Sequence, residues 1–235
     1  MTKYLTEDID LGSGRNKTLC HLSDIHDTDI TPVIVQLREI RPDIICISGD
    51  LCFRHLYPGP RNGMVSAPPA HALTVLGQLR EIAPVFLSRG NHERGWDALD
   101  IAVLSGKNVR FVENNWAEYG DILIGGLPSS KAGPDLKWLD AFERAEGYRI
   151  LLCHHPEYYR KYLKNRKLDL ILSGHAHGGQ IRLGRQGLYA PGQGILPGYT
   201  SGLYDGRLVV SRGLSNARIR IPRLNNPYQT LIIHL

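Results

Sequence analysis

The sequence has few cysteines, and none of its four cysteines belongs to a Cys-x-x-C pair. Zinc sites built on thiolates rely on such pairs, so the sequence gives no support to a structural zinc site of that kind. Cys20, Cys46 and Cys153 lie within apolar runs, where a free cysteine behaves as a small buried hydrophobe. This use of cysteine favours a reduced, cytoplasmic setting.

The sequence also lacks a long apolar run. A membrane-spanning helix needs about 20 predominantly apolar residues, and no segment reaches that length. The first twenty residues of the chain are too charged for the apolar core of a signal peptide; they include Lys3, Glu7, Asp8, Asp10, Arg15 and Lys17. We therefore expect no transmembrane segment, and a peripheral place at a membrane surface stays open.

No internal repeat, linker or low-complexity tract divides the chain. Its 235 residues, 42% of them hydrophobic, suffice for one sizeable core, so we expect a single α/β domain over residues 1–235. The formal charge of +5 and the isoelectric point near 9.0 favour anionic partners. An excess of 28 basic over 23 acidic residues is nevertheless modest for a dedicated nucleic-acid-binding protein.

Apolar runs of strand length alternate with amphipathic segments of helix length. We expect strands over residues 17–23, 43–48, 84–88, 149–153 and 168–172. Thr31 is expected to cap a helix that has Pro32 in its first turn and stops before Pro42. A helix over residues 70–82 is expected to bury Leu73, Leu76 and Leu79.

Each of these five strands is followed by side chains that can bind a metal ion. In open α/β sheets ligands bind beyond the carboxyl ends of the strands, so these side chains are expected to meet at one rim. Taken singly, an aspartate or asparagine there is better interpreted as a turn or cap residue, and a lone His-x-His is weak support for a metal. The set that converges is Asp24, His26, Asp50, Asn91, His92, His154, His175 and His177.

The donors in this set are carboxylate, amide and imidazole groups, with no thiolate. Such a set suits Mn, Fe or Zn. The donors are too numerous for one ion, but with Asp50 as a shared carboxylate they divide into two groups. Binuclear hydrolases use that arrangement to clamp a phosphoryl group. We therefore expect two divalent transition-metal ions as cofactors.

At these residues the chain resembles the calcineurin-like metallophosphoesterase family. The family's motifs D-x-H, G-D, G-N-H, an isolated His and G-H-x-H occur in the family's order, as Asp24-Ile25-His26, Gly49-Asp50, Gly90-Asn91-His92, His154 and Gly174-His175-Ala176-His177. The segments at 174–183, 201–204 and 211–214 are similar to a bacterial branch of phosphoesterases often anchored at membranes. That branch includes lipid-sugar nucleotide pyrophosphohydrolases.

The resemblance implies a role for each residue. Asp24, His26 and His177 match the ligands of one metal, and Asn91, His154 and His175 match those of the other. Asp50 matches the bridging ligand, and His92 matches a histidine that binds no metal and lies beside the leaving group. The implied fold is a four-layer sandwich of two facing mixed β-sheets flanked by helices.

Together these features predict a phosphoesterase that acts on a phosphodiester, pyrophosphate or phosphomonoester of a small molecule or a lipid-linked sugar. The expected nucleophile is a hydroxide between the two metals, because metal binding lowers the pKa of water from about 15.7 to about 7. His92 is expected to protonate or hydrogen-bond the departing oxygen. We expect Asp50 and His92 to be essential for catalysis.

Two other functions stay open. A nuclease fits the high isoelectric point and the arginine-rich tail, but the chain lacks a basic stripe interleaved with aromatic residues. A protein-interaction scaffold fits because one fold can serve several functions, but such scaffolds usually lose metal ligands and this chain keeps them. The sequence makes no prediction of oligomeric state.

Several residues keep two interpretations. Arg54 and His55 follow Asp50 closely, and either contact a substrate phosphate or belong to a solvated loop. The resemblance implies that His154 is the ligand, because it matches the family's His-x-Pro spacing, so His155 is interpreted as a packing or hydrogen-bonding neighbour. For the basic region a solvated strand face is preferred over contact with an anionic substrate; that region comprises Arg212, Arg218, Arg220 and Arg223.

Cys52 and Phe53 stand where many relatives carry an acidic residue shortly after the Gly-Asp pair. This departure bears on the substrate and not on metal binding.

Overall fold

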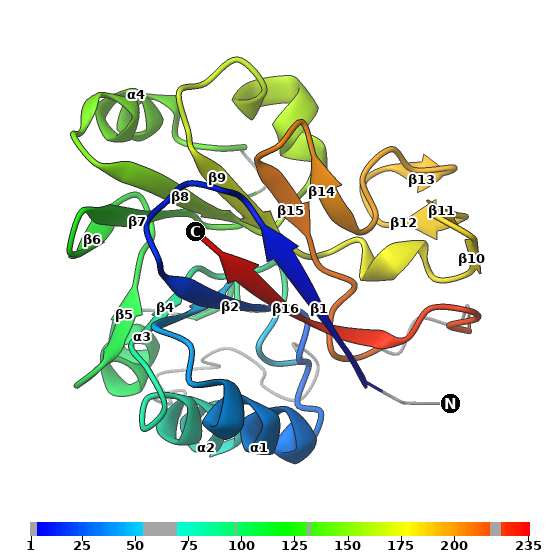
Figure 1. Cartoon of the computed structure of the whole chain (residues 1–235), viewed down its shortest axis with the longest axis horizontal. Helices are drawn as coiled ribbons and strands as arrows, with labels where there is room; N and C mark the ends of the chain where they lie inside the picture. The colour runs from blue at the N-terminus through cyan, green and yellow to red at the C-terminus, as the bar shows by residue number, and fades with distance from the viewer. Residues whose placement is uncertain (1–3, 54–69, 97, 131–132, 217–221) are drawn as a thin grey trace, which may run out of the picture.

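Two six-stranded β-sheets face each other in the computed structural model, which describes residues 4–53, 70–96, 98–130, 133–216 and 222–235. The proposed phosphate contacts Arg54 and His55 lie outside these ranges, as do Arg218 and Arg220. Helices cover the outer face of each sheet (Figure 1). The predicted four-layer sandwich is therefore confirmed.

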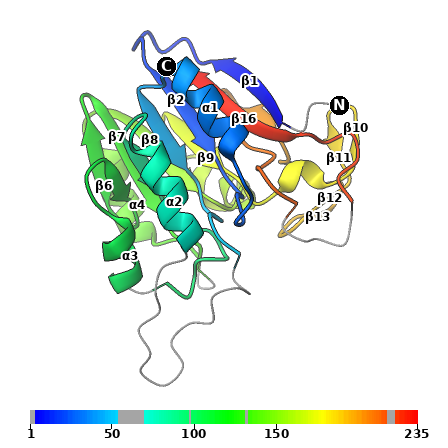
Figure 2. The same ribbon diagram turned by 90° about the horizontal axis from the view of Figure 1, so that it is seen from below.

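The first sheet has the order β1-β16-β2-β3-β4-β5. All neighbouring strands are parallel except β16 and β2. The strands are β1 (Tyr4–Asp10), β16 (Tyr228–His234), β2 (Thr18–Leu22), β3 (Ile44–Ile47), β4 (Val85–Leu87) and β5 (Val109–Phe111). Its outer face is covered by α1 (Thr31–Ile40) and α2 (Ala70–Leu79), with α3 (Ala98–Leu104) nearby, as the view from below shows (Figure 2).

The second sheet has the order β14-β15-β9-β8-β7-β6. Its central strands are parallel and its two outer pairs are antiparallel. The strands are β14 (Gly202–Tyr204), β15 (Leu208–Val210), β9 (Leu170–Ser173), β8 (Tyr148–Cys153), β7 (Ile122–Leu127) and β6 (Trp116–Tyr119). Its outer face packs against α4 (Leu136–Arg144) and a π-helical turn at Tyr159–Leu163.

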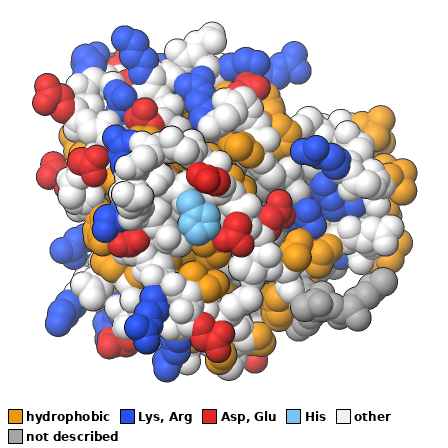
Figure 3. Space-filling model, viewed as in Figure 1, with side chains coloured by type: hydrophobic (Ala, Val, Ile, Leu, Met, Phe, Trp, Pro, Cys, Tyr) orange, Lys and Arg blue, Asp and Glu red, His pale blue; other side chains and the backbone are white. Residues whose placement is uncertain are grey.

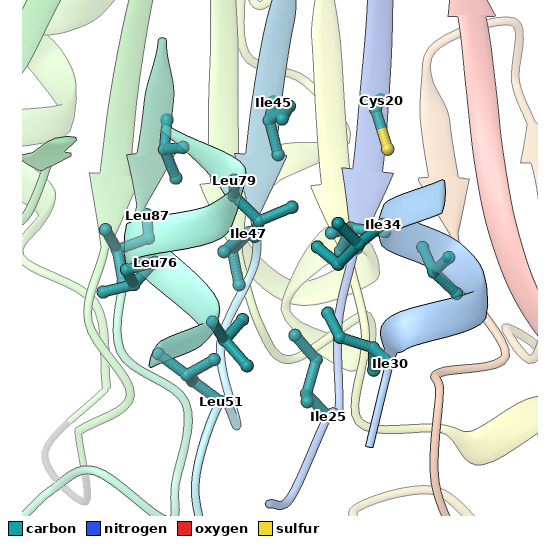
Figure 4. Packing of buried hydrophobic residues seen from close by; sticks show 14 of the residues in the cluster. Cys20, Ile25, Ile30, Ile34, Ile45, Ile47, Leu51, Leu76, Leu79 and Leu87 are labelled. Carbon is teal, nitrogen blue, oxygen red and sulfur yellow. The ribbon is translucent and has the colours of Figure 1, made fainter. Parts of the chain in front are cut away.

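Alternating side chains of the strands build three hydrophobic layers. In β3, Ile44 and Cys46 point between the two sheets, whereas Ile45 and Ile47 point toward the helices. This alternation follows from the two-residue period of a strand. Ile45 and Ile47 pack against Leu76 and Leu79 of α2, and the neighbouring Cys20 packs on the α1 side (Figure 4). The middle layer packs the two sheets against each other.

The structure corrects two local expectations. Thr31 is the first residue of α1 and not its cap; Ile30 takes the cap position without a side-chain hydrogen bond. Asp29 accepts hydrogen bonds from the amide and hydroxyl of Thr31, which removes that hydroxyl from capping. Leu73 of α2 is 43% exposed, because the buried stripe runs through Ala72, Val75, Leu76 and Leu79.

The chain after β9 forms several short strands. Two small hairpins lie beside the second sheet (Figure 1). They pair β10 (Arg182–Leu183) with β11 (Gln186–Gly187), and β12 (Tyr189–Ala190) with β13 (Gly194–Ile195). Among the described residues, no helix has both the length and the apolar character needed to cross a membrane.

Candidate metal centre

The residues that the sequence singled out lie together, and they come from both sheets. Loops after β2, β3 and β4 of the first sheet provide one part, and loops after β8 and β9 of the second sheet provide the other. Backbone hydrogen bonds tie these loops to one another: the Asp24 amide donates to Gly49 O at 3.1 Å, and the Gly174 amide to His154 O at 3.1 Å. The expected single rim is therefore the place where two facing sheets meet.

One group of donors consists of Asp24, His26 and His177. Their ligand atoms all lie within 4.8 Å of one another. Asp24 Oδ1 is 3.8 Å from His26 Nε2 and 3.5 Å from His177 Nε2. These three side chains are buried, so bulk water does not reach their ligand atoms.

A second group consists of Asp50, His154 and His175, again within 4.8 Å of one another. His154 Nε2 is 3.2 Å from Asp50 Oδ2 and 3.2 Å from Asn91 Oδ1, which adds an amide oxygen to this group. Asp50 Oδ2 is also 3.6 Å from His26 Nε2. Asp50 therefore lies between the two groups.

These residues fit divalent cations. Two donors of a tetrahedral ion, each about 2.0–2.2 Å from it, are roughly 3.3–3.6 Å apart, and the donor separations here are 3.2–3.8 Å. Both ring nitrogens of His26 and Nδ1 of His177 are buried without a hydrogen-bond partner among the described residues. Buried polar atoms of this kind are rare without an ion or water to satisfy them.

Hydrogen bonds from neighbouring backbone orient the donors. His154 Nδ1 donates to the carbonyl of Ser48 at 2.9 Å, which leaves Nε2 to face Asp50. The amide of His92 donates to Asp50 Oδ1 at 2.9 Å, and the amide of His175 donates to the Asp24 carboxylate. Such outer contacts fix the tautomer and angle of metal-binding side chains.

Burial holds most of the histidines in the neutral form that binds metals. It lowers the pKa of His26 to about 4 and that of His175 well below its usual value. Burial also acts to lower the pKa of His154, but the effect of the adjacent Asp50 carboxylate is larger and raises the pKa of His154 to about 9. His154 Nε2 faces Asp50 Oδ2 at 3.2 Å, so a proton held there by His154 occupies a position that a cation can take.

The backbone at the site is conformationally unusual. Asp24, His26, Asp50, His175 and His177 have φ between 46° and 64°, a region that non-glycine residues seldom adopt and that is concentrated at functional sites. Gly90 lets the loop after β4 approach, since a Cβ there would lie 2.1 Å from Asp50 Oδ1. At Gly174 a Cβ would lie 2.4 Å from Asp24 Oδ2.

Sequence reasoning missed Glu93, which holds the loop of Asp50 in place. Its Oε2 accepts hydrogen bonds from the amides of Asp50 and Gly90, and its Oε1 accepts one from Cys52. Burial raises the pKa of Glu93 to about 8. Its position directly after Gly90-Asn91-His92 was the available signal, together with the non-acidic Cys52, whose amide hydrogen bond it accepts.

His92 and His155 both lie beside the two donor groups. The His92 ring is 4.6 Å from that of His26, and its Nε2 is 3.8 Å from Asp50 Oδ2. His155 approaches His175 to 4.4 Å between ring centres, but its own nitrogens already meet Ser129 Oγ at 2.6 Å and Glu157 Oε1 at 3.1 Å. His155 is thus a hydrogen-bonding neighbour, although its spacing to Glu157 and His175 could also suit an ion.

A cavity of about 570 Å³ adjoins the site through Ser129. Arg94 and Arg89 line it, and Arg94 donates two hydrogen bonds to Ser129 Oγ, the closer at 2.8 Å. Arg89 is paired with Glu113, whereas Arg94 forms no ion pair with the described residues; the carboxylate of Asp135 also lines the cavity.

The basic tail is not a solvated strand face where the structure describes it. Arg223 donates to the backbone carbonyls of Arg212, Ser215, Asn226 and Pro227. Arg212 precedes Gly213 in the turn after β15, with 17% of its side chain exposed. The preferred sequence interpretation of these two arginines was therefore wrong, because neither residue lies in a strand and neither side chain is fully exposed to solvent.

Several known proteins are similar to this chain in sequence. YpbG of Bacillus subtilis (strain 168) is 26% identical over 233 residues, which cover 93% of this chain and 80% of YpbG. YkuE of the same organism, named as a metallophosphoesterase, is 28% identical over 229 residues, covering 90% of this chain and 74% of YkuE. A transmembrane protein with a metallophosphoesterase domain from Bos taurus is 29% identical over 187 residues, 68% of this chain and 40% of that protein.

A solved structure supports the fold. The crystal structure of TT1561 from Thermus thermophilus matches with a TM-score of 0.53 and 14% identity, over 85% of this chain and 90% of that one. The family model described as calcineurin-like phosphoesterase matches residues 17–179, which include both donor groups. The chain belongs to the calcineurin-like phosphoesterase family.

Proposed function

We propose that the chain is a binuclear metal-dependent phosphoesterase. Its substrate would be a phosphodiester, pyrophosphate or phosphomonoester of a small molecule or a lipid-linked sugar. The observation that carries this proposal is the pair of donor groups joined by Asp50, whose Oδ2 is 3.2 Å from His154 and 3.6 Å from His26. Family membership supports hydrolysis of phosphoric esters.

The proposed ligands follow the two donor groups. Asp24, His26 and His177 would hold one ion, and Asn91, His154 and His175 the other, with Asp50 between them. Oxygen and imidazole donors without thiolate suit Mn, Fe or Zn. When bound, such a pair supplies a water of lowered pKa as nucleophile and positive charge for the phosphoryl oxygens.

His92 is proposed to serve the leaving group. Its amide holds Asp50 Oδ1, and its ring lies at the edge of the centre with 19% of the side chain exposed. An imidazole in that place can pass a proton to a departing oxygen, a contribution of about 10²–10⁴-fold in rate. The cavity beside Ser129 offers room for the organic part of the substrate, with Arg94 for an anionic group.

The surroundings of this activity are proposals as well. We propose one domain over residues 1–235, supported by the middle hydrophobic layer to which both ends of the chain contribute. We also propose a cytoplasmic protein, supported by four cysteines that are all buried and free.

Hydrolysis of a substrate panel with Mn, Fe or Zn tests the proposal. The panel contains p-nitrophenyl phosphate, its bis-ester, a nucleoside diphosphate sugar, and DNA and RNA. We expect turnover of at least one small ester, and a loss of about 10²-fold or more in Asp50→Asn, the level expected when a shared metal ligand is impaired. The control His234→Ala removes a histidine that contacts Asp8 away from the site, and should leave turnover unchanged.

Three results would overturn the proposal. Degradation of DNA or RNA without turnover of small esters would identify a nuclease. Equal turnover by wild type and Asp50→Asn would remove the centre from catalysis. Absence of both bound metal and turnover would leave a scaffold.

A further inference from the structure

A second polar pocket lies away from the donor groups, beside the hairpin β10-β11 and the loop that precedes β14. It encloses about 330 Å³, and its charged lining among the described residues consists of Arg182, Arg185, Arg212 and the carboxylate of Glu7. We call it the arginine pocket. Figure 3 shows Lys and Arg side chains gathered on this side of the molecule, between its main body and the small strands. Three guanidinium groups against one carboxylate leave an excess of positive charge.

Arg182 is buried without an acidic partner. It is 4% exposed, and its guanidinium donates to Gly178 O at 2.8 Å, Arg185 O at 2.6 Å and Thr200 Oγ1 at 3.2 Å. Within the part of the chain that the structure describes, no carboxylate oxygen comes within 4.0 Å of it. A buried charge paired only with neutral oxygens is costly, and an anion in the pocket would offset that cost.

Arg212 faces the same space. Its Nε donates to Ser201 Oγ at 3.0 Å, while its Nη2 is 3.9 Å from Glu7 Oε2, beyond hydrogen-bond distance. That oxygen of Glu7 already accepts a hydrogen bond from Gln229. Burial lowers the pKa of Arg182, and the positive charge of Arg212 lowers it further. The two guanidinium groups therefore repel each other across the pocket.

Hydroxyl groups complete the lining. Tyr204 Oη accepts hydrogen bonds from the amides of Thr200 and Ser201, and its own proton meets no acceptor within the described ranges. Ser201 Oγ accepts a hydrogen bond from Arg212, and no described residue accepts the Ser201 proton. Guanidinium forks combined with hydroxyl donors suit an anion with several oxygens, because each oxygen can accept more than one hydrogen bond.

We propose that the arginine pocket binds the phosphate group of a small soluble anion. A phosphate dianion matches the excess charge and offers enough oxygens for three arginines. The site is independent of the proposed catalytic centre, yet one hydrogen bond connects the two regions. Arg182 holds the carbonyl of Gly178, which directly follows His177. An anion bound there contacts the same guanidinium that holds this turn.

Calorimetric titration of the full chain with inorganic phosphate tests the proposal, both as purified and after removal of metals by a chelator. Circular dichroism confirms that each sample is folded. We expect one phosphate-binding site per chain to remain after chelation, because guanidinium and hydroxyl groups of the pocket, and not a metal ion, would bind the phosphate. Arg212→Gln should weaken this binding at least about tenfold, as expected for loss of a charge-assisted hydrogen bond.

A second variant and a control keep the test decisive if Arg212→Gln does not fold. Arg185 is exposed, so Arg185→Gln should fold and still weaken phosphate binding. Arg38→Gln removes an exposed arginine from α1 and should leave phosphate binding unchanged. Absence of phosphate binding after chelation, or equal affinity in all three variants, would overturn the proposal. So would retention on phosphatidate vesicles without binding of glycerol 3-phosphate, which would assign the pocket to a lipid headgroup.

Discussion

The candidate metal centre and the arginine pocket are two buried polar regions that differ in the charge of the groups they leave unpaired. In the centre, carboxylates and neutral imidazoles face one another, and His26 and His177 have ring nitrogens without a hydrogen-bond partner among the described residues. In the pocket, guanidinium groups face neutral oxygens and one carboxylate. The first arrangement attracts cations and the second attracts anions. The unpaired groups of each region therefore indicate the charge of the ligand that the region would bind.

Removing a ligand from the centre should give the largest effect. His177→Ala removes a proposed ligand, so we expect hydrolysis to fall more than about 100-fold, above the 10–100-fold typical of residues that only support a ligand. Phosphate binding by the chelated chain should stay at the wild-type level. Steady-state kinetics and calorimetry check the two parts. If His177→Ala abolished both, the two regions would not be independent sites.

Glu93→Gln should weaken the centre less than loss of a ligand. Both carboxylate oxygens of Glu93 accept hydrogen bonds from backbone amides. A glutamine keeps one accepting oxygen, but its side-chain NH2 group would face a backbone N–H that is itself a donor. The loop carrying Asp50 should shift, and metal affinity should fall about 10–100-fold. Competition with a metal-sensitive dye measures this affinity. Wild-type affinity in the variant would show that Glu93 does not position Asp50.

His155→Gln distinguishes a neighbour from a ligand. Its ring nitrogens contact Ser129 and Glu157, so its loss should leave metal content unchanged and reduce turnover by less than the 10–100-fold expected for a direct support of a ligand. Elemental analysis of the purified variant gives the metal content. A loss of one ion per chain would instead make His155 a ligand.

The smallest change serves as a reference for both regions. Gly77 lies in α2, and a Cβ there would meet no heavy atom within 4 Å. Gly77→Ala should raise the free energy of unfolding by about 0.5–1 kcal/mol, because alanine loses less backbone entropy in a helix. Chemical denaturation measures this, and metal content and phosphate binding should not change. Destabilisation would mean that the surroundings of α2 differ from those described.

The two regions also differ in how well the sequence predicts them. The residues of the metal centre belong to short motifs that directly follow strands. General rules of α/β folds therefore place Asp24, Asp50 and His154 together at the carboxyl ends of those strands. The strands themselves were found because β3 and β9 are continuous apolar runs. What the rules did not show was that two different sheets supply the donors.

The arginine pocket could not be predicted in the same way. Arg182 lies in the two-residue strand β10 and Arg212 in the turn after β15, and the pocket that they line also includes Glu7 of β1, which is distant from both in sequence. Glu93 escaped notice because its role is to accept backbone amides, and amides carry no residue-specific pattern. Leu73 was misplaced because the apolar residues of α2 are numerous enough to allow more than one buried stripe.

Anomalous diffraction from crystals grown with Mn²⁺ tests the central claim most directly. The account predicts two manganese peaks per chain, one bound by Asp24, His26 and His177, the other by Asn91, His154 and His175, with Asp50 contacting both. A single peak, or two peaks that do not share Asp50, would contradict it.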